Sequence, residues 1–497
     1  MSLVLDRLGR GDDWSRVHAV VGGLAVSGYA AADALVQHGA RVSVLDDADD
    51  DELREKATIL AVLGAMVRLG PGSTAELPAD ADVVVVTPGM PPRIPLLVQA
   101  VQRGVPIWGE VELAWRLRTV RHEEASPAPW LCVTGSNGKT TTVQLLDAML
   151  RAAGLRSRAV GNVGTPLSQA VLDPVGVDVF AVELSSFQLH WSHTVAPQAS
   201  LVLNVAADHL DWYAGSPGAA PQTAMADYVR DKGRVYARTE AACVYHLADP
   251  VTEQLVCDAE VAPGCRAVGY GTRIPPVGAV GVVDDVIVDR AFVEQRQTSA
   301  VELASVHDLA PLTPHTLADA VAAAALARAH GVAPTAVRDG LRAFRPGAHR
   351  ISEVAVVDEV RFVDDSKATN PHAAEASLSG FDPVVWVAGG LAKGAEFDDL
   401  VRAVADRLRG VVLIGRDRAV VAAAMRRHAP DVPVIDAGDR ETGETSVMDW
   451  VVQAAAGLAR PGDTVLLAPA CASQDMFRDY GARGDAFAAA VRRRAGG

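Results

Sequence analysis

One segment constrains the fold of this chain more than any other, the run Leu131-Cys-Val-Thr-Gly-Ser-Asn-Gly-Lys-Thr-Thr-Thr142. An apolar stretch typical of a buried strand leads directly into two glycines and a lysine, and a helical pattern begins at once. The glycines allow backbone N–H groups to turn inward around phosphate oxygens, and Lys139 supplies a positive charge. The segment therefore predicts a strand–loop–helix unit of a parallel α/β sheet that binds a phosphate group.

The loop departs from the commonest phosphate-binding spacing. It follows the pattern T-G-x-x-G-K-T, because Val133 stands where the longer G-x-x-x-x-G-K-[ST] motif has its first glycine. A polar helix cap without a ligand is the alternative interpretation. The strand before the loop and the helix after it favour phosphate binding, with the hydroxyl of Thr140 available to Mg²⁺.

Similar strand–turn–helix units recur along all 497 residues, a length that corresponds to roughly three domains. Residues 250–310 are rich in Val, Asp and Gly and predict a β excursion, and interruptions at 116–130 and 344–349 predict hinges. We expect an α/β chain of three domains, at 1–118, 119–346 and 347–497. Strands are predicted at 17–21, 41–45, 83–87, 131–133, 179–183, 201–204, 384–388, 410–414, 432–435 and 464–467, and helices at 29–38, 140–153 and 316–329.

Charge and cysteine content narrow the class of protein. The net charge of −15 argues against a general binder of nucleic acids or anionic membranes, while leaving room for a local cationic pocket. The five cysteines are scattered and form no C-x-x-C pair, which is typical of reduced thiols in the cytoplasm.

Residues 17–40 are apolar and contain no Lys or Arg, as a signal peptide or membrane span would be. Gly22, Gly23 and Gly28 interrupt the run and Asp33 follows, which favours a buried strand, a tight turn and a helix. The glycine turn is also a loose relative of the dinucleotide-binding fingerprint, so a nucleotide site and a turn needed only for packing both remain open.

Polar side chains follow two further predicted strands of the central series. Glu183 ends one strand, where a buried carboxylate is costly unless it meets a cation, and Asp208 and His209 follow another. The carboxyl ends of parallel strands meet at one edge of a sheet, so Thr140, Glu183 and His209 predict a magnesium site. A capped surface glutamate and a structural histidine are the alternatives.

The third series carries three polar loops at strand ends. One packs Asp364, Asp365 and Lys367 together, one holds Lys393 between glycines, and one runs from 466 to 475. Their clustering predicts a second ligand face, and Arg350 at the second hinge is a candidate bridge between ligands.

The order of these motifs resembles the Mur ligase family over nearly the whole chain. The resemblance rests on the segments TGSNGKTTT, AVGNVGTP, ELSSFQL, NVAADHLD, HR, DDSKATNP, GGLAKG and LAPACASQDMF. The loop D-S-K-A-T-N-P is similar to that of members that add D-glutamate, whereas members that add other amino acids carry different residues there.

The resemblance implies an ATP- and Mg²⁺-dependent ligase of cytoplasmic peptidoglycan precursor synthesis. It would join D-glutamate to UDP-N-acetylmuramoyl-L-alanine through an acyl phosphate. A Rossmann-like N-terminal domain would hold UDP, a central P-loop domain ATP, and a Rossmann-like C-terminal domain the amino acid. We expect a monomer that neither binds nucleic acid nor inserts into a membrane.

The resemblance also assigns roles to individual residues. Catalysis is assigned to Lys139, His209, Lys232 and Lys367. ATP contacts are assigned to Gly135, Ser136, Asn137, Gly138, Lys139, Thr140, Thr141, Arg350 and Asp365. Contacts with the UDP substrate are assigned to Ser27, Gly28, Asp46, Asp47, Thr87, Pro88, Gly89, Asn162, Ser185 and Gln188. D-Glutamate is assigned to Lys367, Ser473 and Lys393, and Mg²⁺ to Thr140, Glu183, His209 and, if its amine is carbamylated, Lys232.

Two departures from the family pattern affect this transfer. His315-Thr-Leu-Ala-Asp319 stands where many relatives have H-N-x-x-N near the adenine, and Lys393 follows Leu391 and Ala392 where some relatives carry Asp.

The alternatives are a sister ligase that adds another amino acid, a folylpolyglutamate synthase-like ligase, a nucleotide-dependent switch, and an NAD-dependent dehydrogenase. Without the resemblance, Lys232 would be interpreted as an exposed lysine on a helix.

Overall fold

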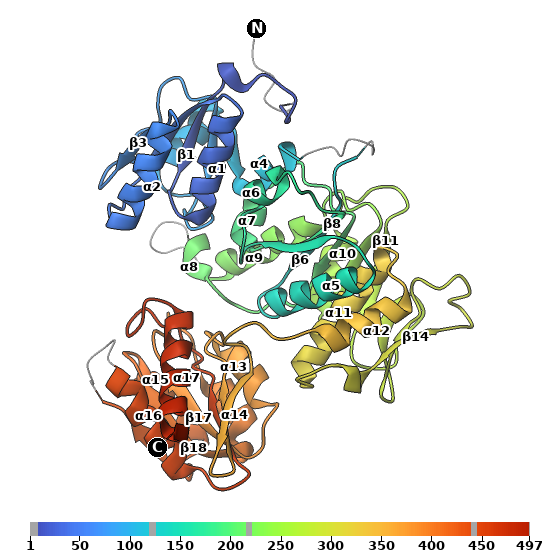
Figure 1. Cartoon of the computed structure of the whole chain (residues 1–497), viewed down its shortest axis with the longest axis vertical. Coiled ribbons are helices and arrows are strands. Elements are labelled where there is room, and N and C mark those ends of the chain that lie inside the picture. The colour runs from blue at the N-terminus through green and yellow to red at the C-terminus, as the bar shows by residue number, and fades with distance from the viewer. Residues whose placement is uncertain (1–7, 119–125, 215–220, 439–444, 497) are drawn as a thin grey trace. The chain divides into compact units, whose positions relative to one another are not determined.

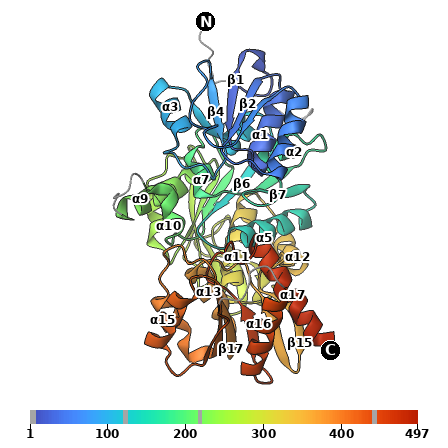
Figure 2. The same ribbon diagram turned by 90° about the vertical axis from the view of Figure 1, so that its left-hand side faces the viewer.

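The computed structural model describes residues 8–118, 126–214, 221–438 and 445–496. Three β-sheets with their helices form two compact units (Figures 1 and 2). The first unit comprises residues 1–308 and 319–343 and contains two sheets, and the second comprises 309–318 and 344–497 and contains the third. The mixed α/β class is confirmed. Residues 119–125 of the first predicted hinge lie outside the described residues.

The N-terminal sheet is parallel throughout, with strand order β3-β2-β1-β4-β5. Its strands are β1 (His18–Gly22), β2 (Arg41–Asp46), β3 (Met66–Leu69), β4 (Val83–Val86) and β5 (Ile107–Gly109). Its helices are α1 (Val26–Gln37), α2 (Asp51–Val62), α3 (Pro95–Arg103) and α4 (Glu110–Arg116), with a 3-10 turn at Trp14–Arg16.

Both faces of this sheet are buried, which explains the unbroken apolar runs of its strands. Ala19 and Val21 of β1 pack with α1 on one face, whereas Val20 packs with α3 on the other. The apolar segment at 17–40 is therefore a strand and a twelve-residue helix, and α1 begins at Val26 rather than near residue 29. No helix within the described ranges is long and apolar enough to cross a membrane.

The central sheet has nine strands in the order β14-β13-β12-β11-β10-β9-β6-β8-β7. They are β6 (Trp130–Thr134), β7 (Ser157–Gly161), β8 (Val179–Glu183), β9 (Ala199–Val202), β10 (Ala242–His246), β11 (Arg266–Tyr270), β12 (Ala279–Val283), β13 (Val286–Asp289) and β14 (Val301–Ser305). The predicted β excursion extends this sheet, and β12, β13 and β14 pair antiparallel at its end.

The helices of this region are α5 (Lys139–Ala152), α6 (Leu167–Leu172), α7 (Ser186–His190), α8 (Leu210–Tyr213), α9 (Pro221–Gly233), α10 (Pro250–Cys257), α11 (Pro314–Ala329) and α12 (Pro334–Ala343), with 3-10 turns at Arg234–Tyr236 and Val306–Asp308. Helices α5 to α10 lie between the strands of this sheet in the chain, and α11 and α12 follow the last strand, β14. Helix α5 begins one residue before its predicted start. The loop at residues 135–138, called the phosphate loop below, therefore leads straight into the first turn of this helix.

A buried carboxylate joins α4 of the N-terminal sheet to the loop before β9. Glu112 accepts hydrogen bonds from the hydroxyl of Thr194 at 2.6 Å, from the backbone N–H groups of Thr194 and His193, and from Arg116. Burial alone would raise the pKa of Glu112, but these hydrogen bonds and the Arg116 charge together lower it. The carboxylate therefore stays ionised and holds the two sheets of the first unit together.

The C-terminal sheet has the order β15-β16-β20-β17-β18-β19 and is parallel except for β15. Its strands are β15 (Ser352–Val357), β16 (Val360–Asp364), β17 (Val384–Gly389), β18 (Leu408–Ile414), β19 (Val434–Asp436) and β20 (Thr464–Leu467). Its helices are α13 (Pro371–Leu378), α14 (Asp398–Val404), α15 (Arg418–His428), α16 (Thr445–Leu458) and α17 (Tyr480–Gly496), with a 3-10 turn at Ala405–Arg407.

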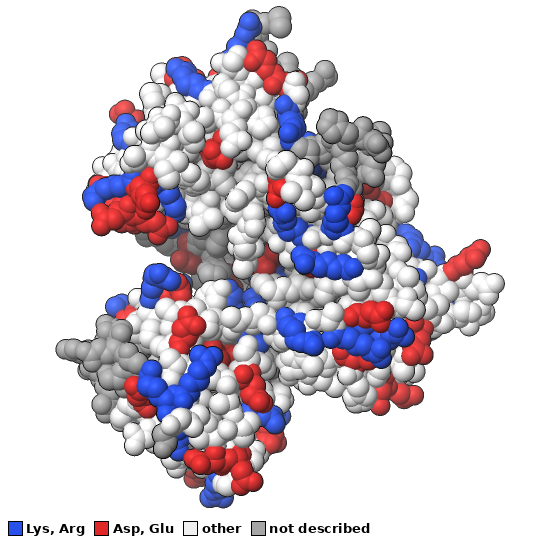
Figure 3. Space-filling view, viewed as in Figure 1, with Lys and Arg blue, Asp and Glu red and all other residues white. Residues whose placement is uncertain are grey.

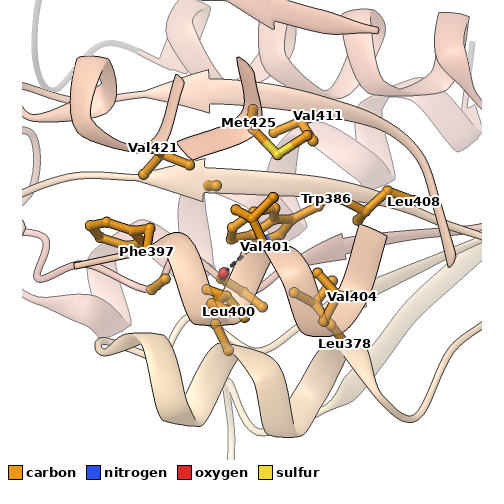
Figure 4. Packing of buried hydrophobic residues seen from close by; sticks show 14 of the residues in the cluster. Leu378, Trp386, Phe397, Leu400, Val401, Val404, Leu408, Val411, Val421 and Met425 are labelled. Atoms are coloured by element: carbon orange, nitrogen blue, oxygen red, sulfur yellow. Dashed lines mark hydrogen bonds between the residues drawn. The ribbon is translucent and has the colours of Figure 1, made fainter. Parts of the chain in front are cut away.

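Alternate residues of its central strand face opposite helical layers. Trp386 packs with Leu400, Val401 and Met425 on the side of α14 and α15, and its indole N–H donates to the carbonyl of Ala468 at 2.7 Å (Figure 4). The intervening valines of β17 pack with α16 and α17. This two-sided burial fixes the sheet from which the C-terminal loops project.

Charged side chains of both signs are interspersed on the face drawn in Figure 3. On this face the charges therefore form small patches of either sign rather than one field.

The close packing of α12 on α5 predicts that one methyl group added at Gly340 lowers the stability of the protein. A Cβ atom at Gly340 would lie 2.5 Å from the Cα atom of Met149, in the helix that follows the phosphate loop. We expect Gly340→Ala to lower the free energy of unfolding by about 1–3 kcal/mol because backbone must move. Gly457→Ala, in an open position of α16, is the control and should be neutral or slightly stabilising. Equal denaturant midpoints for the two variants would contradict this packing argument.

Candidate active site

The phosphate loop lies at the carboxyl end of β6 and is anchored by the end of β9. The backbone N–H of Asn137 donates to the side-chain oxygen of Asn204 at 3.0 Å, and the Asn204 amide donates back to the Asn137 carbonyl at 3.1 Å. The N–H of Ser136 donates to the Asn204 carbonyl, and the Ser136 hydroxyl contacts the Tyr228 hydroxyl at 2.8 Å. Gly138 has a φ of +85°, a backbone conformation that glycine adopts without strain. These contacts give the loop a fixed shape before any ligand is considered.

Two lysine side chains converge on one carbonyl of this loop. The amines of Lys139 and Lys232 each donate to the carbonyl oxygen of Gly135 at 2.8 Å. Lys232 is only 2% exposed and its amine lies 4.4 Å from the centre of the Tyr228 ring, so it is not an exposed helix lysine. Burial and the charge of Lys139 lower the pKa of Lys232 well below its usual value, against a smaller opposing effect of Asp208.

Thr140 and Glu183 meet beside the loop, as predicted. The Thr140 hydroxyl donates to a Glu183 carboxylate oxygen at 2.6 Å, and the side-chain amide of Asn162 donates to the other at 2.9 Å. Glu183 is 3% exposed and has no salt-bridge partner among the described residues. A buried carboxylate with neutral partners favours a nearby cation, and carboxylate and hydroxyl oxygens are suitable ligands for Mg²⁺.

His209 lies apart from this pair in its contacts. It has a φ of +52° at the start of α8, its ring packs edge-on against Phe187 at 5.6 Å, and its Nε2 lies 3.6 Å from the Asp208 carboxylate. No group of three His, Cys, Asp or Glu side chains poised for a metal occurs in the part of the chain that the structure describes. The structure thus brings Thr140 and Glu183 together and does not add His209 to them.

Ser185 and Gln188 form the capping box of α7. The Ser185 hydroxyl accepts from the Gln188 backbone N–H, and the Gln188 side chain accepts from the Ser185 backbone N–H at 2.9 Å. Gln188 is buried in this arrangement. The two residues therefore orient the helix that follows Glu183.

The loops assigned to UDP meet at the carboxyl ends of β1, β2 and β4. A Cβ atom at Gly28 would lie 2.0 Å from the Gly23 carbonyl and 2.7 Å from a Thr87 methyl, so Gly28 allows these loops to touch. Asp46 accepts from the Leu24 N–H at 2.7 Å, and Thr74 lowers the pKa of Asp47 by hydrogen bonding. Ser27 lies in the first turn of α1, and Pro88 and Gly89 follow Thr87 directly.

Within the second unit, three predicted loops meet at the carboxyl ends of β16, β17 and β20. Lys367 places its amine 3.9 Å from the centre of the Tyr480 ring, and Lys393 is exposed with a φ of +49°. Ser473 is buried, and its hydroxyl has no hydrogen-bond partner within the described residues.

Asp365, assigned with Arg350 to ATP, is also buried. Burial raises its pKa to about 6, although a hydrogen bond from Ser377 and the charge of Arg350 act in the opposite direction. Asp365 also accepts from the Ile351 N–H at 3.3 Å, which ties the start of β15 to the end of β16.

Sequence reasoning missed two residues of the central site, Asn204 and Tyr228, which hold the phosphate loop. Asp319, named in the departure from H-N-x-x-N, has a carboxylate oxygen beside the position that a Cβ atom of Gly138 would take. Asn204 ends a predicted strand in the motif NVAADHLD, so its position was the available signal. Thr316, doubtful as an adenine contact, uses its hydroxyl locally on the Pro311 carbonyl.

Three parts of the chain match models of Mur ligase domains. They are the Mur ligase MurD-like N-terminal domain at residues 17–109, the Mur ligase middle domain at 133–308, and the Mur ligase glutamate ligase domain at 349–471.

Curated relatives are similar over nearly their full lengths. A UDP-N-acetylmuramoylalanine–D-glutamate ligase of Streptomyces coelicolor is 55% identical and the match covers 97% of this chain and 98% of that protein. Ligases of the same name from Thermobifida fusca and Mycolicibacterium smegmatis are 52% and 47% identical, over 96% and 95% of this chain and 98% and 96% of the relatives.

Solved structures share the fold at low identity. A pseudomurein peptide ligase type C from Methanothermus fervidus aligns with a TM-score of 0.56 at 15% identity, covering 96% of this chain and 99% of that one. UDP-N-acetylmuramate-alanine ligase MurC from Thermotoga maritima aligns with a TM-score of 0.53 at 17% identity, with the same coverage. With three matching domain models and relatives of this similarity, the chain belongs to the Mur ligase family.

Proposed function

We propose that this chain is an ATP-dependent ligase that joins D-glutamate to UDP-N-acetylmuramoyl-L-alanine and releases ADP and phosphate. The observation that carries the proposal is its similarity, over nearly the whole chain, to relatives named for this reaction. The phosphate loop at the end of β6 supports the use of ATP, as does membership of a family of ATP-dependent ligases.

The reaction proceeds in two chemical steps. The alanine carboxylate attacks the γ-phosphorus of ATP, which forms an acyl phosphate and releases ADP. The amine of D-glutamate then attacks the acyl carbon, phosphate leaves, and the nitrogen loses a proton as the amide forms. A carboxylate is a poor electrophile, and phosphorylation gives it a good leaving group. Lys139 at the loop supports this role, because its ammonium can offset charge on the transferred phosphoryl group.

A magnesium ion fits the donors beside the loop. Thr140 and Glu183 supply adjacent oxygens, and His209 and a carbamylated Lys232 are proposed as further ligands. When bound, Mg²⁺ would neutralise phosphate charge and orient the phosphate oxygens. The phosphate contacts of ATP are proposed at Gly135, Ser136, Asn137, Gly138, Lys139, Thr140 and Thr141, with Arg350 and Asp365 completing the nucleotide set.

The two other substrates are proposed to occupy the loops of the first and third sheets. The UDP moiety is assigned to Ser27, Gly28, Asp46, Asp47, Thr87, Pro88 and Gly89, and the muramoyl-alanine part to Asn162, Ser185 and Gln188. Lys367, Ser473 and Lys393 are assigned to D-glutamate, whose two carboxylates suit cations and a hydroxyl donor. We also propose domains at 1–118, 119–346 and 347–497, a monomeric state and a cytoplasmic location.

The amino-acid requirement tests the proposed reaction directly. Purified protein with ATP, Mg²⁺ and UDP-N-acetylmuramoyl-L-alanine should release phosphate when D-glutamate is added. It should do so far less with L-glutamate, L-alanine or meso-diaminopimelate, because the subsite must hold the amine and the two carboxylates in the arrangement that the D configuration and the side-chain length of D-glutamate give them. Equal rates with L-glutamate would point to a sister ligase, and no release with any muramoyl precursor would refute the proposal.

Lys139 provides a second test. Lys139→Ala should lower kcat/KM by at least about a hundredfold, because a fixed charge beside the phosphates is lost. Lys56→Ala is the matched control, since Lys56 forms only an exposed salt bridge with Glu52 on α2. Phosphate release measures both. A Lys139→Ala enzyme within tenfold of the control would remove Lys139 from the proposed chemistry.

Lys232 provides a third test, through the carbamate. A buried lysine with a lowered pKa has more uncharged amine at neutral pH, and only the uncharged amine adds carbon dioxide. We expect Lys232→Ala to lose most activity and to regain part of it with short-chain carboxylic acids, which supply an anion in place of the carbamate.

Two further measurements distinguish a carbamate from other roles of Lys232. Labelled bicarbonate should produce a carbamate signal in the wild-type protein that is absent in Lys232→Ala. Lys139→Ala should not respond to the acids, because its missing group is a cation. Full activity of Lys232→Ala would show that the reaction does not need this lysine, and no carbamate signal in the active wild type would show that the lysine is not carbamylated.

A further inference from the structure

A buried arginine lies beneath the amino-acid loops of the second unit. Arg483 is the fourth residue of α17 and is 1% exposed. Its Nε donates to the Ser366 hydroxyl at 2.9 Å and its Nη2 to the Ser366 carbonyl at 2.8 Å. Its Nη1 donates to the carbonyl of Cys471 at 3.1 Å. One guanidinium thus bonds two loops that are 105 residues apart in the chain.

The bonded positions adjoin the residues assigned to the amino acid. Ser366 directly precedes Lys367, and Cys471 lies two residues before Ser473. The Ser366 hydroxyl also donates to the Tyr480 carbonyl at 2.7 Å, and the Tyr480 ring lies under the Lys367 amine. The spacing between Lys367 and Ser473 therefore depends on where the guanidinium holds the two backbones.

The charge of Arg483 is not cancelled by a direct partner. Burial lowers its pKa to about 10, which leaves the guanidinium protonated at neutral pH. Among the described residues it forms no salt bridge, and its acceptors are two carbonyls and a hydroxyl. The negative charges of Asp475 and Asp364 raise its pKa against the effect of burial but do not bond to the guanidinium, whose positive charge favours an anionic ligand.

We propose that Arg483 is the positioning residue of the amino-acid subsite: it fixes Lys367 and Ser473 at the spacing that a dicarboxylic amino acid requires, and its charge favours that dianion. The inference rests on the proposed function, because it takes the ligand of these loops to be D-glutamate. It adds to that function a residue that touches no substrate and acts through the loop backbones.

Two substitutions separate geometry from charge. Arg483→Lys keeps the charge but cannot direct three donors to three acceptors, so KM for D-glutamate should rise about tenfold. Arg483→Gln also removes the charge and should raise that KM further, by about a hundredfold in total. In both, KM for the UDP substrate should change less than about twofold, because the residues assigned to that substrate belong to the first unit.

The control is Arg409→Lys, a change of the same kind in the same sheet. Arg409 binds Asp463 with two nitrogens at the amino ends of the strands, away from these loops. It should leave KM for D-glutamate unchanged. If the Arg483 variants do not fold, Ser366→Ala removes one acceptor alone and should raise that KM about threefold.

Steady-state kinetics of these variants, measured beside a wild-type preparation that shows D-glutamate-dependent turnover, test the inference. A selective rise in KM for D-glutamate with kcat within about twofold supports the inference. A fall in kcat or thermal stability with that KM unchanged, in Arg483→Lys or in Ser366→Ala, would show a merely structural arginine and overturn it. A wild-type protein that shows no D-glutamate-dependent turnover would instead refute the proposed function.

Discussion

The carbonyl oxygen of Gly135 is the point on which the central site depends. Two lysine amines donate to it at 2.8 Å, one from the first turn of α5 and one from α9. Burial disfavours a charged amine at this position and the charge of Lys139 adds to that effect, so the pKa of Lys232 falls. Asn204 and Tyr228 keep the loop from relaxing away from this arrangement. The same loop then sets the start of α5 and directs the Thr140 hydroxyl to Glu183.

Parallel strands explain how one chain can present a separate cluster of loops to each of the three proposed ligands. In each sheet the loops at the carboxyl ends of neighbouring strands lie together, while the interior strands that carry them are largely apolar and buried on both faces. The N-terminal loops touch through Gly28, the central ones through Asn204, and the C-terminal ones through Arg483. Each sheet therefore uses a different device, a missing side chain, a side-chain amide or a buried cation, to hold its loops at working distance.

Much of this fold could be predicted from sequence. Residues 179–183 and 464–467 form β8 and β20 as predicted, because strands buried on both faces are continuous apolar runs. The predicted ranges missed β3, β5, β7, β10 and β15. Of these, β3, β7 and β15 are edge strands with partly exposed residues, so their sequences lack such runs, whereas β10 is an interior strand. In the sites, short motifs identified the loops. Contacts between residues about a hundred positions apart in the sequence could not be inferred from those motifs. Lys232 has charged neighbours in sequence, and its burial arises only because α9 packs on the phosphate loop.

The choice between lysine and arginine in the sequence nevertheless carried a signal about the sites. The chain has 46 Lys and Arg residues, of which only five are lysines, at 56, 139, 232, 367 and 393. Arginine is used where a rigid, permanently charged fork holds a structure in place, as at Arg116, Arg409 and Arg483. Lysine differs in two ways that matter here: its ammonium is a compact charge on a flexible stem, and burial can remove its proton. A flexible point charge suits Lys139 and Lys367 beside phosphate and carboxylate groups, and a removable proton suits Lys232. Of these lysines, Lys232 is therefore at a position where arginine could not perform the proposed chemistry, because a guanidinium keeps its proton.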